Sequence, residues 1–296
     1  MIQKIIKKIK LDNLPSGSGI EVIDNIIYII GDDSPFLYCL NFDFNIINKI
    51  ELFKTEHFKT GRIPKKLKYD FECITKLEIQ GKKHLLICGS GSNSNREKAY
   101  LVNIDNNYSV LELSLSELFE EVKKDISLVK NNVLNIEGLA TNKDNIYFFD
   151  RENNSIFYYD INSFIKYLIG ETKEIPIYSF KKFELEGIND IKSSFSGADI
   201  CNNKIFFTSS VEDTNDAISD GEVYGSFIGY IEFDENKNLE SLVTDCSVIM
   251  YNENIFQGKV ESISIYKEIS KYEYLALAVT DDDKGGSELL ELKIIL

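Results

Sequence analysis

Residues 137–161, EGLATNKDNIYFFDRENNSIFYYDI, hold short runs of Ile, Phe and Tyr separated by Asn, Asp and Lys. Aromatic and β-branched residues favour strands, whereas Asn and Asp favour turns. We therefore predict a short strand, a turn, the strand IYFFD, a polar loop and the strand IFYYDI. The same outline recurs in four other segments, which start at Ser18, Glu72, Ser196 and Glu261.

The repeats start roughly 60 residues apart, which suits one four-stranded unit per repeat. A candidate fourth strand follows each of the first four repeats, such as KIELF at 49–53. Only three strands remain after Glu261, and the N-terminal strand at 2–11, IQKIIKKIKL, has no repeat of its own. It would complete the last unit and remove an open edge. We predict an all-β fold, a five-bladed β-propeller that forms one domain over residues 1–296. The alternatives are a six-bladed propeller or a β-sandwich.

Composition excludes several classes of function. The 296 residues are 43% hydrophobic and 27% charged, which supports a packed core. The formal net charge of −15 argues against sequence-independent binding to nucleic acid or an anionic membrane. We expect a monomer with a small-molecule or cationic ligand. The only histidines are His57 and His84, which excludes a multi-histidine zinc site.

Targeting signals and cysteines bear on the compartment. No run approaches the ~20 apolar residues of a membrane span, and residues 1–14 lack the features of a signal peptide. The cysteines are odd in number, far apart and form no CxxC motif, so we expect reduced, buried thiols in a cytoplasmic protein. They are Cys39, Cys73, Cys88, Cys201 and Cys246.

Two segments depart from the strand pattern. Residues 114–126, SLSELFEEVKKDI, start with a serine that can cap a helix. Their apolar residues Leu115, Leu118, Phe119 and Val122 recur at helical spacing. We predict one surface helix there, and a second short helical turn near residues 162–169.

The repeat starts are candidate metal ligands. The first strand of each propeller blade lines the central channel, so equivalent residues point at one axis. Three carboxylates at one level would raise one another's pKa unless a cation lay between them. Oxygen ligands suit calcium, which takes about six to eight of them, whereas zinc favours nitrogen and sulfur. We predict one axial Ca²⁺ ion; the alternative is a metal-free channel filled with water. The expected ligands are Ser18, Glu72, Glu137, Ser196 and Glu261.

The ends of the second strands should surround one mouth of the channel, where loops from every blade meet. We expect this mouth to be strongly acidic, with Arg96 and Arg151 as possible binding groups for an anion. The alternative is that these are ordinary turn residues. The candidates for a catalytic base are Asp32, Asp33, Asp150 and Glu212. The candidates for substrate binding are Ser90, Arg96, Arg151, Asp213 and Asp281.

Other motifs are less specific. Residues 89–96 could cradle a phosphate but lack the lysine and the helix start of a P-loop, so a plain loop is favoured. Residues 214–224 are favoured as a solvated loop over a lid. The basic stretch 57–68, HFKTGRIPKKLK, is interpreted as a surface linker, and His84 as structural.

The repeats resemble two families. The order Ser, Glu, Glu, Ser, Glu at the five repeat starts is similar to that of the calcium-activated apyrases, five-bladed propellers with one axial calcium. Local strings are also similar: IIYIIGDD at 26–33, EGLATNKDNIYFFDR at 137–151 and TSSVED at 208–213. The resemblance implies the same calcium site, while the basic residues with which apyrases grip nucleotides are reduced here to Arg96 and Arg151.

A closer resemblance is to an uncharacterised bacterial family of predicted propellers. It rests on PSGSGIE at 15–21, GDDSPFLY at 31–38, GSGS at 89–92 and FSGAD at 195–199. This resemblance implies a fold and no reaction. Two functions therefore stay open. One is a calcium-dependent hydrolase of phosphate or carboxylic esters, in which a mouth carboxylate activates water. The other is a non-catalytic ligand-binding or scaffold propeller with structural calcium.

Overall fold

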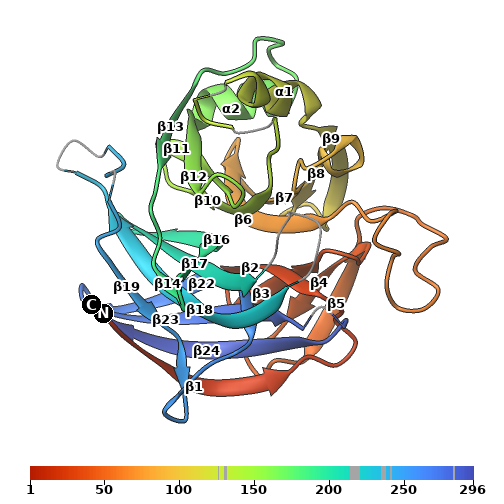
Figure 1. Ribbon diagram of the computed structural model, residues 1–296. Helices are drawn as coiled ribbons and strands as arrows, with labels where there is room; N and C mark the ends of the chain where they lie inside the picture. Colours follow the sequence, from red (N-terminus) through yellow and green to blue (C-terminus); the bar gives the residue numbers. More distant parts are fainter. Residues whose placement is uncertain (126, 130–131, 214–220, 235–237, 241, 283) are drawn as a thin grey trace.

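Five four-stranded antiparallel sheets surround a common axis in the computed structural model (Figure 1). The structure describes all residues except 126, 130–131, 214–220, 235–237, 241 and 283. The fold is the predicted five-bladed β-propeller, and the described residues also form two short α-helices in connections between strands. In each blade the strands follow one another from the axis outward, because short turns join antiparallel neighbours.

The blades follow the predicted repeats closely. Blade 1 contains β2 (Gly17–Ile23), β3 (Ile26–Gly31), β4 (Phe36–Leu40) and β5 (Ile46–Glu51). Blade 2 contains β6 (Phe71–Ile79), β7 (Lys82–Gly89), β8 (Lys98–Asn103) and β9 (Ser109–Ser114). Blade 3 contains β10 (Ile136–Thr141), β11 (Asn145–Asp150), β12 (Ser155–Asp160) and β13 (Tyr178–Lys182). Blade 4 contains β16 (Ser194–Cys201), β17 (Lys204–Asp213), β18 (Glu222–Glu232) and β19 (Asp245–Val248).

The last blade joins the two ends of the chain. It contains β22 (Lys259–Ser270), β23 (Glu273–Asp281), β24 (Ser287–Ile295) and, as its outermost strand, β1 (Ile2–Lys10). β1 pairs antiparallel with β24, from Ile2 opposite Ile295 to Lys10 opposite Glu288. The N-terminal strand therefore closes the ring as predicted, and its lysines protect the remaining outer edge from pairing with other chains.

Small elements lie between the blades. Two-stranded ribbons are formed by β14 (Gly187–Ile188) with β15 (Ile191–Lys192), and by β20 (Met250–Tyr251) with β21 (Asn254–Ile255). A 3₁₀ turn, η1 (Ser94–Arg96), follows β7. Residues 52–70, between β5 and β6, are called the linker below.

The predicted helices are present, with boundaries that differ by one or two residues. α1 runs over Ser116–Lys124 and buries Leu118, Phe119 and Val122, as the spacing predicts. Ser114 ends β9 and Leu115 takes the N-cap position, yet the Ser114 hydroxyl accepts from the amide of Ser116, the first residue of the helix, at 3.3 Å. α2 runs over Ile161–Leu168, and the Asp160 carboxylate caps it by accepting from the Ser163 amide.

The core lies between neighbouring blades. One buried cluster packs Ile30 and Leu37 of blade 1 against Ile74, Leu85 and Ile87 of blade 2. All five cysteines are free thiols, and Cys39, Cys73 and Cys88 are buried. Among the described residues, no helix has the length and apolar character needed to cross a membrane.

Candidate metal site and channel mouth

The five predicted ligands occupy one equivalent position in the fold. In every blade the pairing of the innermost strand with the second strand slips by one residue, and the extra residue is the predicted ligand. Such a β-bulge leaves its extra residue out of the ladder and redirects its side chain. The repeat alignment is therefore correct to the residue at Ser18, Glu72, Glu137, Ser196 and Glu261.

The two serines tie neighbouring blades together. Ser18 Oγ donates to the Phe71 carbonyl at 2.5 Å, and Ser196 Oγ donates to the Val260 carbonyl at 2.6 Å. Each carbonyl belongs to the residue just before the bulge glutamate of the next blade. A hydroxyl that donates in this bond has only lone pairs left for a further partner, and the Ser196 oxygen also lies 3.0 Å from Thr208 Oγ1.

The three glutamates lie in surroundings that disfavour their charge. Glu137 and Glu261 are buried, and Glu137 Oε1 accepts from Asn135 Nδ2 at 2.7 Å. Burial is the first cause that raises the pKa of all three, to about 8 for Glu261. For Glu72 the next causes are the carboxylates of Asp70 and Glu137. In the absence of an added cation, this ring of carboxylates therefore favours bound protons.

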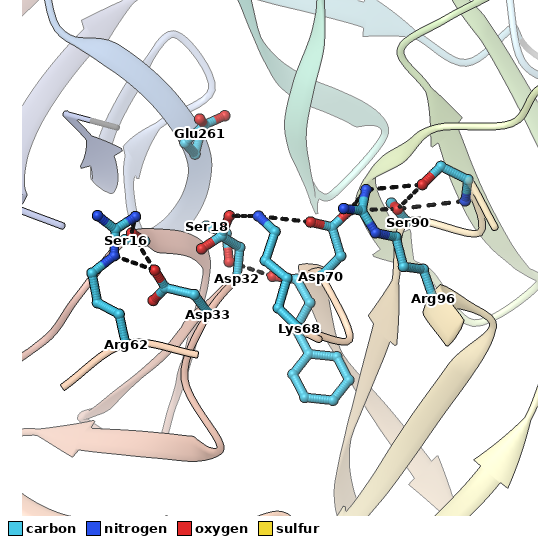
Figure 2. Close-up of polar contacts among 12 residues, drawn as sticks. Ser16, Ser18, Asp32, Asp33, Arg62, Lys68, Asp70, Ser90, Arg96 and Glu261 are labelled. Carbon is cyan, nitrogen blue, oxygen red and sulfur yellow. Dashed lines mark hydrogen bonds and ion pairs between the residues drawn. The ribbon is translucent and has the colours of Figure 1, made fainter. Parts of the chain in front are cut away.

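Lys68 lies between two carboxylates on one side of the mouth (Figure 2). Its ammonium group binds Asp32 Oδ2 and lies 2.8 Å from Asp70 Oδ1. Arg96 lies 2.7 Å from the other Asp70 oxygen. The carboxylates of Asp32, Asp70 and Glu72 are close enough to share one metal ion. Among the described residues this is the acidic group whose oxygens lie closest together, and it shares Glu72 with the axial set. Lys68 already supplies a positive charge there, as Lys259 does at Glu261.

A second network lies on the other side of the mouth. Arg151 Nη2 and Lys259 Nζ each lie 2.9 Å from a Glu212 oxygen. Lys259 also lies 3.0 Å from Glu261 Oε1. Glu261 Oε2 is buried and has no hydrogen-bond partner among the described residues. The predicted axial ligand Glu261 therefore has one carboxylate oxygen with no hydrogen-bond donor among the described residues.

The linker corrects the prediction of a strongly acidic mouth. We interpreted residues 57–68 as a surface connection, yet Arg62 and Lys68 reach the mouth. Arg62 pairs with Asp33, and its Nη2 donates to Ser16 Oγ at 3.1 Å. The two arginines expected to bind an anion already have partners: Arg96 pairs with Asp70, and Arg151 pairs with Glu212. A negatively charged ligand would have to compete with those carboxylates.

The residue two positions before each bulge was not predicted to be part of the site, although this residue is polar in all five repeats. These residues are Ser16, Asp70, Asn135, Ser194 and Lys259, and all five are polar. The described contacts of Asn135 and Lys259 include the bulge glutamate of their own blade. Aligning the repeats two residues further upstream would have revealed them.

Asp150 is the most enclosed of the candidate bases. It is fully buried, and its carboxylate accepts from the amides of Asn135 and Glu152 and from Asn153 Nδ2. Burial raises the pKa of Asp150 to about 7. These bonds tie the turn after β11 to Asn135, which precedes β10 and binds Glu137, so Asp150 helps to position this glutamate.

The remaining predicted residues lie apart or in ordered loops. Ser90 Oγ donates to Asp70 Oδ2 at 2.6 Å, so the serine-rich loop folds around this aspartate. Asp213 is exposed at the end of β17. Of the loop 214–224, residues 214–220 lie outside the described residues, and β18 starts at Glu222. His84 is buried on β7 against the Lys82 carbonyl, at 2.9 Å, which agrees with a structural role.

Two hollows flank Asp281 at the rim of the mouth. One, of about 350 Å³, is lined by residues that include Asp32, Asp33, Arg62 and Lys68. The other, of about 420 Å³, is lined by residues that include Lys259, Thr280 and Ser287. Asp281 contributes to both, which places this predicted substrate-binding residue between two spaces large enough for a small molecule.

The far end of the channel is crossed by an internal ion-pair layer. Lys76 Nζ lies 3.1 Å from Glu21 Oε1 and 3.5 Å from Asp199 Oδ1. Ser264 Oγ hydrogen-bonds both carboxylates at 3.4 Å. These four residues come from the innermost strands β2, β6, β16 and β22. The layer therefore links four blades across the axis.

Replacing Lys76 by Met is expected to destabilise the protein by roughly 1–3 kcal/mol. Glu21 and Asp199 are buried and would lose their cation; the effect falls below that of a fully buried pair because Lys76 is 41% exposed. Urea unfolding measures the change. The control is Lys83→Met, whose partner Asp24 is exposed, and it should leave stability unchanged. Equal stability of the two variants would contradict a structural role for the layer.

Comparison with known proteins places the chain in a family and supports the fold. Residues 13–294 match the model of a family described as "Family of unknown function (DUF6929)". The structure is similar to glutaminyl cyclase of Myxococcus xanthus, with 8% identity over 99% of this chain and 97% of that chain and a TM-score of 0.53. It is also similar to the major Malassezia sympodialis allergen Mala s 1, with 10% identity over 96% and 95% of the chains and a TM-score of 0.50. At these identities the similarity shows the fold alone. No curated protein matches the sequence.

Proposed function

The chain belongs to that family of unknown function, and from its own residues we propose that the propeller binds one divalent cation, calcium by preference, on its axis. The ligands are the side chains at the five bulges. The observation that carries the proposal is their equivalence: five blades each present an oxygen-bearing side chain at the same point of the innermost strand.

The charges near the axis support a divalent ion. Six carboxylates lie there with four basic side chains, so full ionisation of all six leaves two negative charges in excess. One divalent cation would balance them and would oppose the rise in the pKa of the glutamates. The carboxylates are Asp32, Asp70, Glu72, Glu137, Glu212 and Glu261, and the basic side chains are Lys68, Arg96, Arg151 and Lys259.

The donor set favours calcium over other metals. All five side chains offer oxygen, which suits calcium and its tolerant geometry. Zinc favours nitrogen and sulfur ligands, and magnesium requires a stricter octahedron. The unpartnered Glu261 Oε2 is the oxygen that gains most from a cation, because a buried charged acceptor without a partner is costly.

We further propose that the mouth supports hydrolysis of phosphate or carboxylic esters. The bound cation would polarise the ester oxygen. Asp32 is the base best placed to activate water, because its Oδ1 has no described hydrogen-bond partner and burial raises its pKa to about 6. Asp150 is enclosed by its own turn, so we assign it a positioning role.

A screen with chromogenic phosphate and acetate esters tests the hydrolase. We expect turnover with calcium, loss of turnover with chelator, and a fall of roughly 10²- to 10⁴-fold in Asp32→Asn. Activity should rise with pH through about 6, as Asp32 ionises. Calcium-independent turnover, or an Asp32→Asn variant as active as the wild type, would contradict this mechanism.

Both arginines predicted to bind an anion are already paired with carboxylates, and this favours a second candidate function. Arg96 binds Asp70 and Arg151 binds Glu212, so neither guanidinium is poised for a phosphate. A ligand-binding propeller with structural calcium fits this arrangement. A protein that binds calcium and hydrolyses neither class of ester would support it.

A further inference from the structure

The smaller of the two rim hollows has a fixed wall and an apolar floor. The linker is anchored to blade 1, because the Ile63 amide donates to the Asp33 carbonyl at 2.8 Å. Ile63 is buried, and Pro64 lies beside it in the lining. Two consecutive aspartates, Asp32 and Asp33, form the polar side. The cavity of about 350 Å³ therefore pairs a short apolar surface with two carboxylates.

Each of these carboxylates has one satisfied and one unsatisfied oxygen. Asp33 is 2% exposed, and its Oδ2 binds Arg62 and Ser16. Asp32 Oδ2 binds Lys68. The Oδ1 atoms of both aspartates are buried and have no hydrogen-bond partner within the described part of the chain. Leaving a buried acceptor unpaired costs about 1–3 kcal/mol, and more when it is charged. A ligand that donates hydrogen bonds to both of these oxygens would remove this cost.

The charge balance indicates a ligand with one positive charge. The lining holds three carboxylates, from Asp32, Asp33 and Asp281, and three basic groups, from Arg62, Lys65 and Lys68. Lys68 is shared with Asp70 outside the hollow, so it compensates Asp32 only in part. The cations beside the aspartates would repel a divalent ion more strongly than a monovalent one.

We propose that this hollow binds the protonated primary amine of a small molecule. An ammonium group has three donors, so it can satisfy Asp32 Oδ1 and Asp33 Oδ1 together. The carbon chain next to it would lie against Ile63 and Pro64. The site shares Asp32 with the proposed hydrolytic mouth and adjoins the axial ligand Glu72, but amine binding does not require the axial cation.

Calorimetric titration with n-butylamine at pH 7.5, in chelator, tests the site. n-Butanol keeps the carbon chain without the charge, and tetramethylammonium keeps the charge without the donors. We expect saturable binding of butylamine with a Kd on the order of 1–10 mM, as befits so small a probe, and no saturable binding of the other two. Absence of saturable butylamine binding, or equal binding of butanol or tetramethylammonium, would overturn the proposal.

Variants locate the bound amine. Asp33→Asn should weaken butylamine binding at least tenfold, whereas Asp43→Asn, in an exposed turn, should leave it unchanged. Because Asp33 also anchors Arg62, Asp32→Asn serves as a second variant, with the same loss expected. Undiminished binding in both folded variants would refute the assignment. Glu137→Gln should retain butylamine binding, so failure of the axial site and failure of this site give different results.

Discussion

Replacing Glu137 by Gln is expected to abolish the stabilisation of this protein by calcium. A ligand that binds only the folded state adds about 2.7 kcal/mol at a hundred times its Kd. The wild type should therefore unfold at a temperature several degrees higher in calcium than in chelator. The substitution keeps the size of the side chain and removes its charge, so the cation loses a strong ligand. Thermal unfolding of both proteins, with and without calcium, measures the effect.

The same substitution should have the opposite effect in chelator. Glu137 is buried, and burial raises its pKa, so keeping it ionised at neutral pH opposes folding. A glutamine carries no charge, and the cation-free variant should be more stable than the cation-free wild type. Glu56→Gln, at an exposed linker position, is the control and should change neither state. A Glu137→Gln protein that still responds fully to calcium would contradict the axial site.

Calcium affinity is expected to rise steeply between about pH 6 and pH 8.5. Burial raises the pKa of Glu261 to about 8, so below this pH the cation must displace a proton. Displacing one proton changes the affinity about tenfold per pH unit below the pKa. Glu261 alone gives a rise of roughly 100-fold over this range, and the raised pKa of Glu72 and Glu137 adds to it.

The cation-free protein should show the matching trend in stability. The folded state holds a proton on Glu261 that the unfolded state has released above its ordinary pKa. Stability therefore falls as pH rises from about 4.5 towards 8, and calcium should cancel this fall. Calorimetry in two buffers of different ionisation enthalpy measures the released protons. Affinity independent of pH, with no proton release at pH 7, would contradict a cation held by Glu261.

The fold could be predicted because the repeats are local. Each blade is a run of antiparallel strands joined by short turns, so its pattern is continuous in the sequence, as in EGLATNKDNIYFFDRENNSIFYYDI at 137–161. Counting the strands after Glu261 predicted the pairing of β1 with β24. The positions of the axial residues followed from the same alignment, since the bulge recurs at one point of every repeat.

The surroundings of the axial residues were harder to predict. Lys68 and Arg62 belong to an irregular linker, and no periodic pattern shows that it folds over the mouth. Their partners, Asp32 and Asp33, lie about 30 residues away in the sequence. The acidic residues at the ends of the second strands therefore predicted an acidic mouth, whereas basic side chains of the linker compensate much of that charge. The start of α1 shows the same limit, because strand pairing extends to Ser114 and moves the first helical residue to Ser116.

The most direct test of the central claim is a crystal structure of the protein grown with calcium and measured at a wavelength where calcium scatters anomalously. One anomalous peak is predicted on the axis, coordinated by the carboxylates of Glu72, Glu137 and Glu261 together with the hydroxyls of Ser18 and Ser196. No peak on the axis in calcium-saturated crystals, or a peak only at surface aspartates, would contradict it.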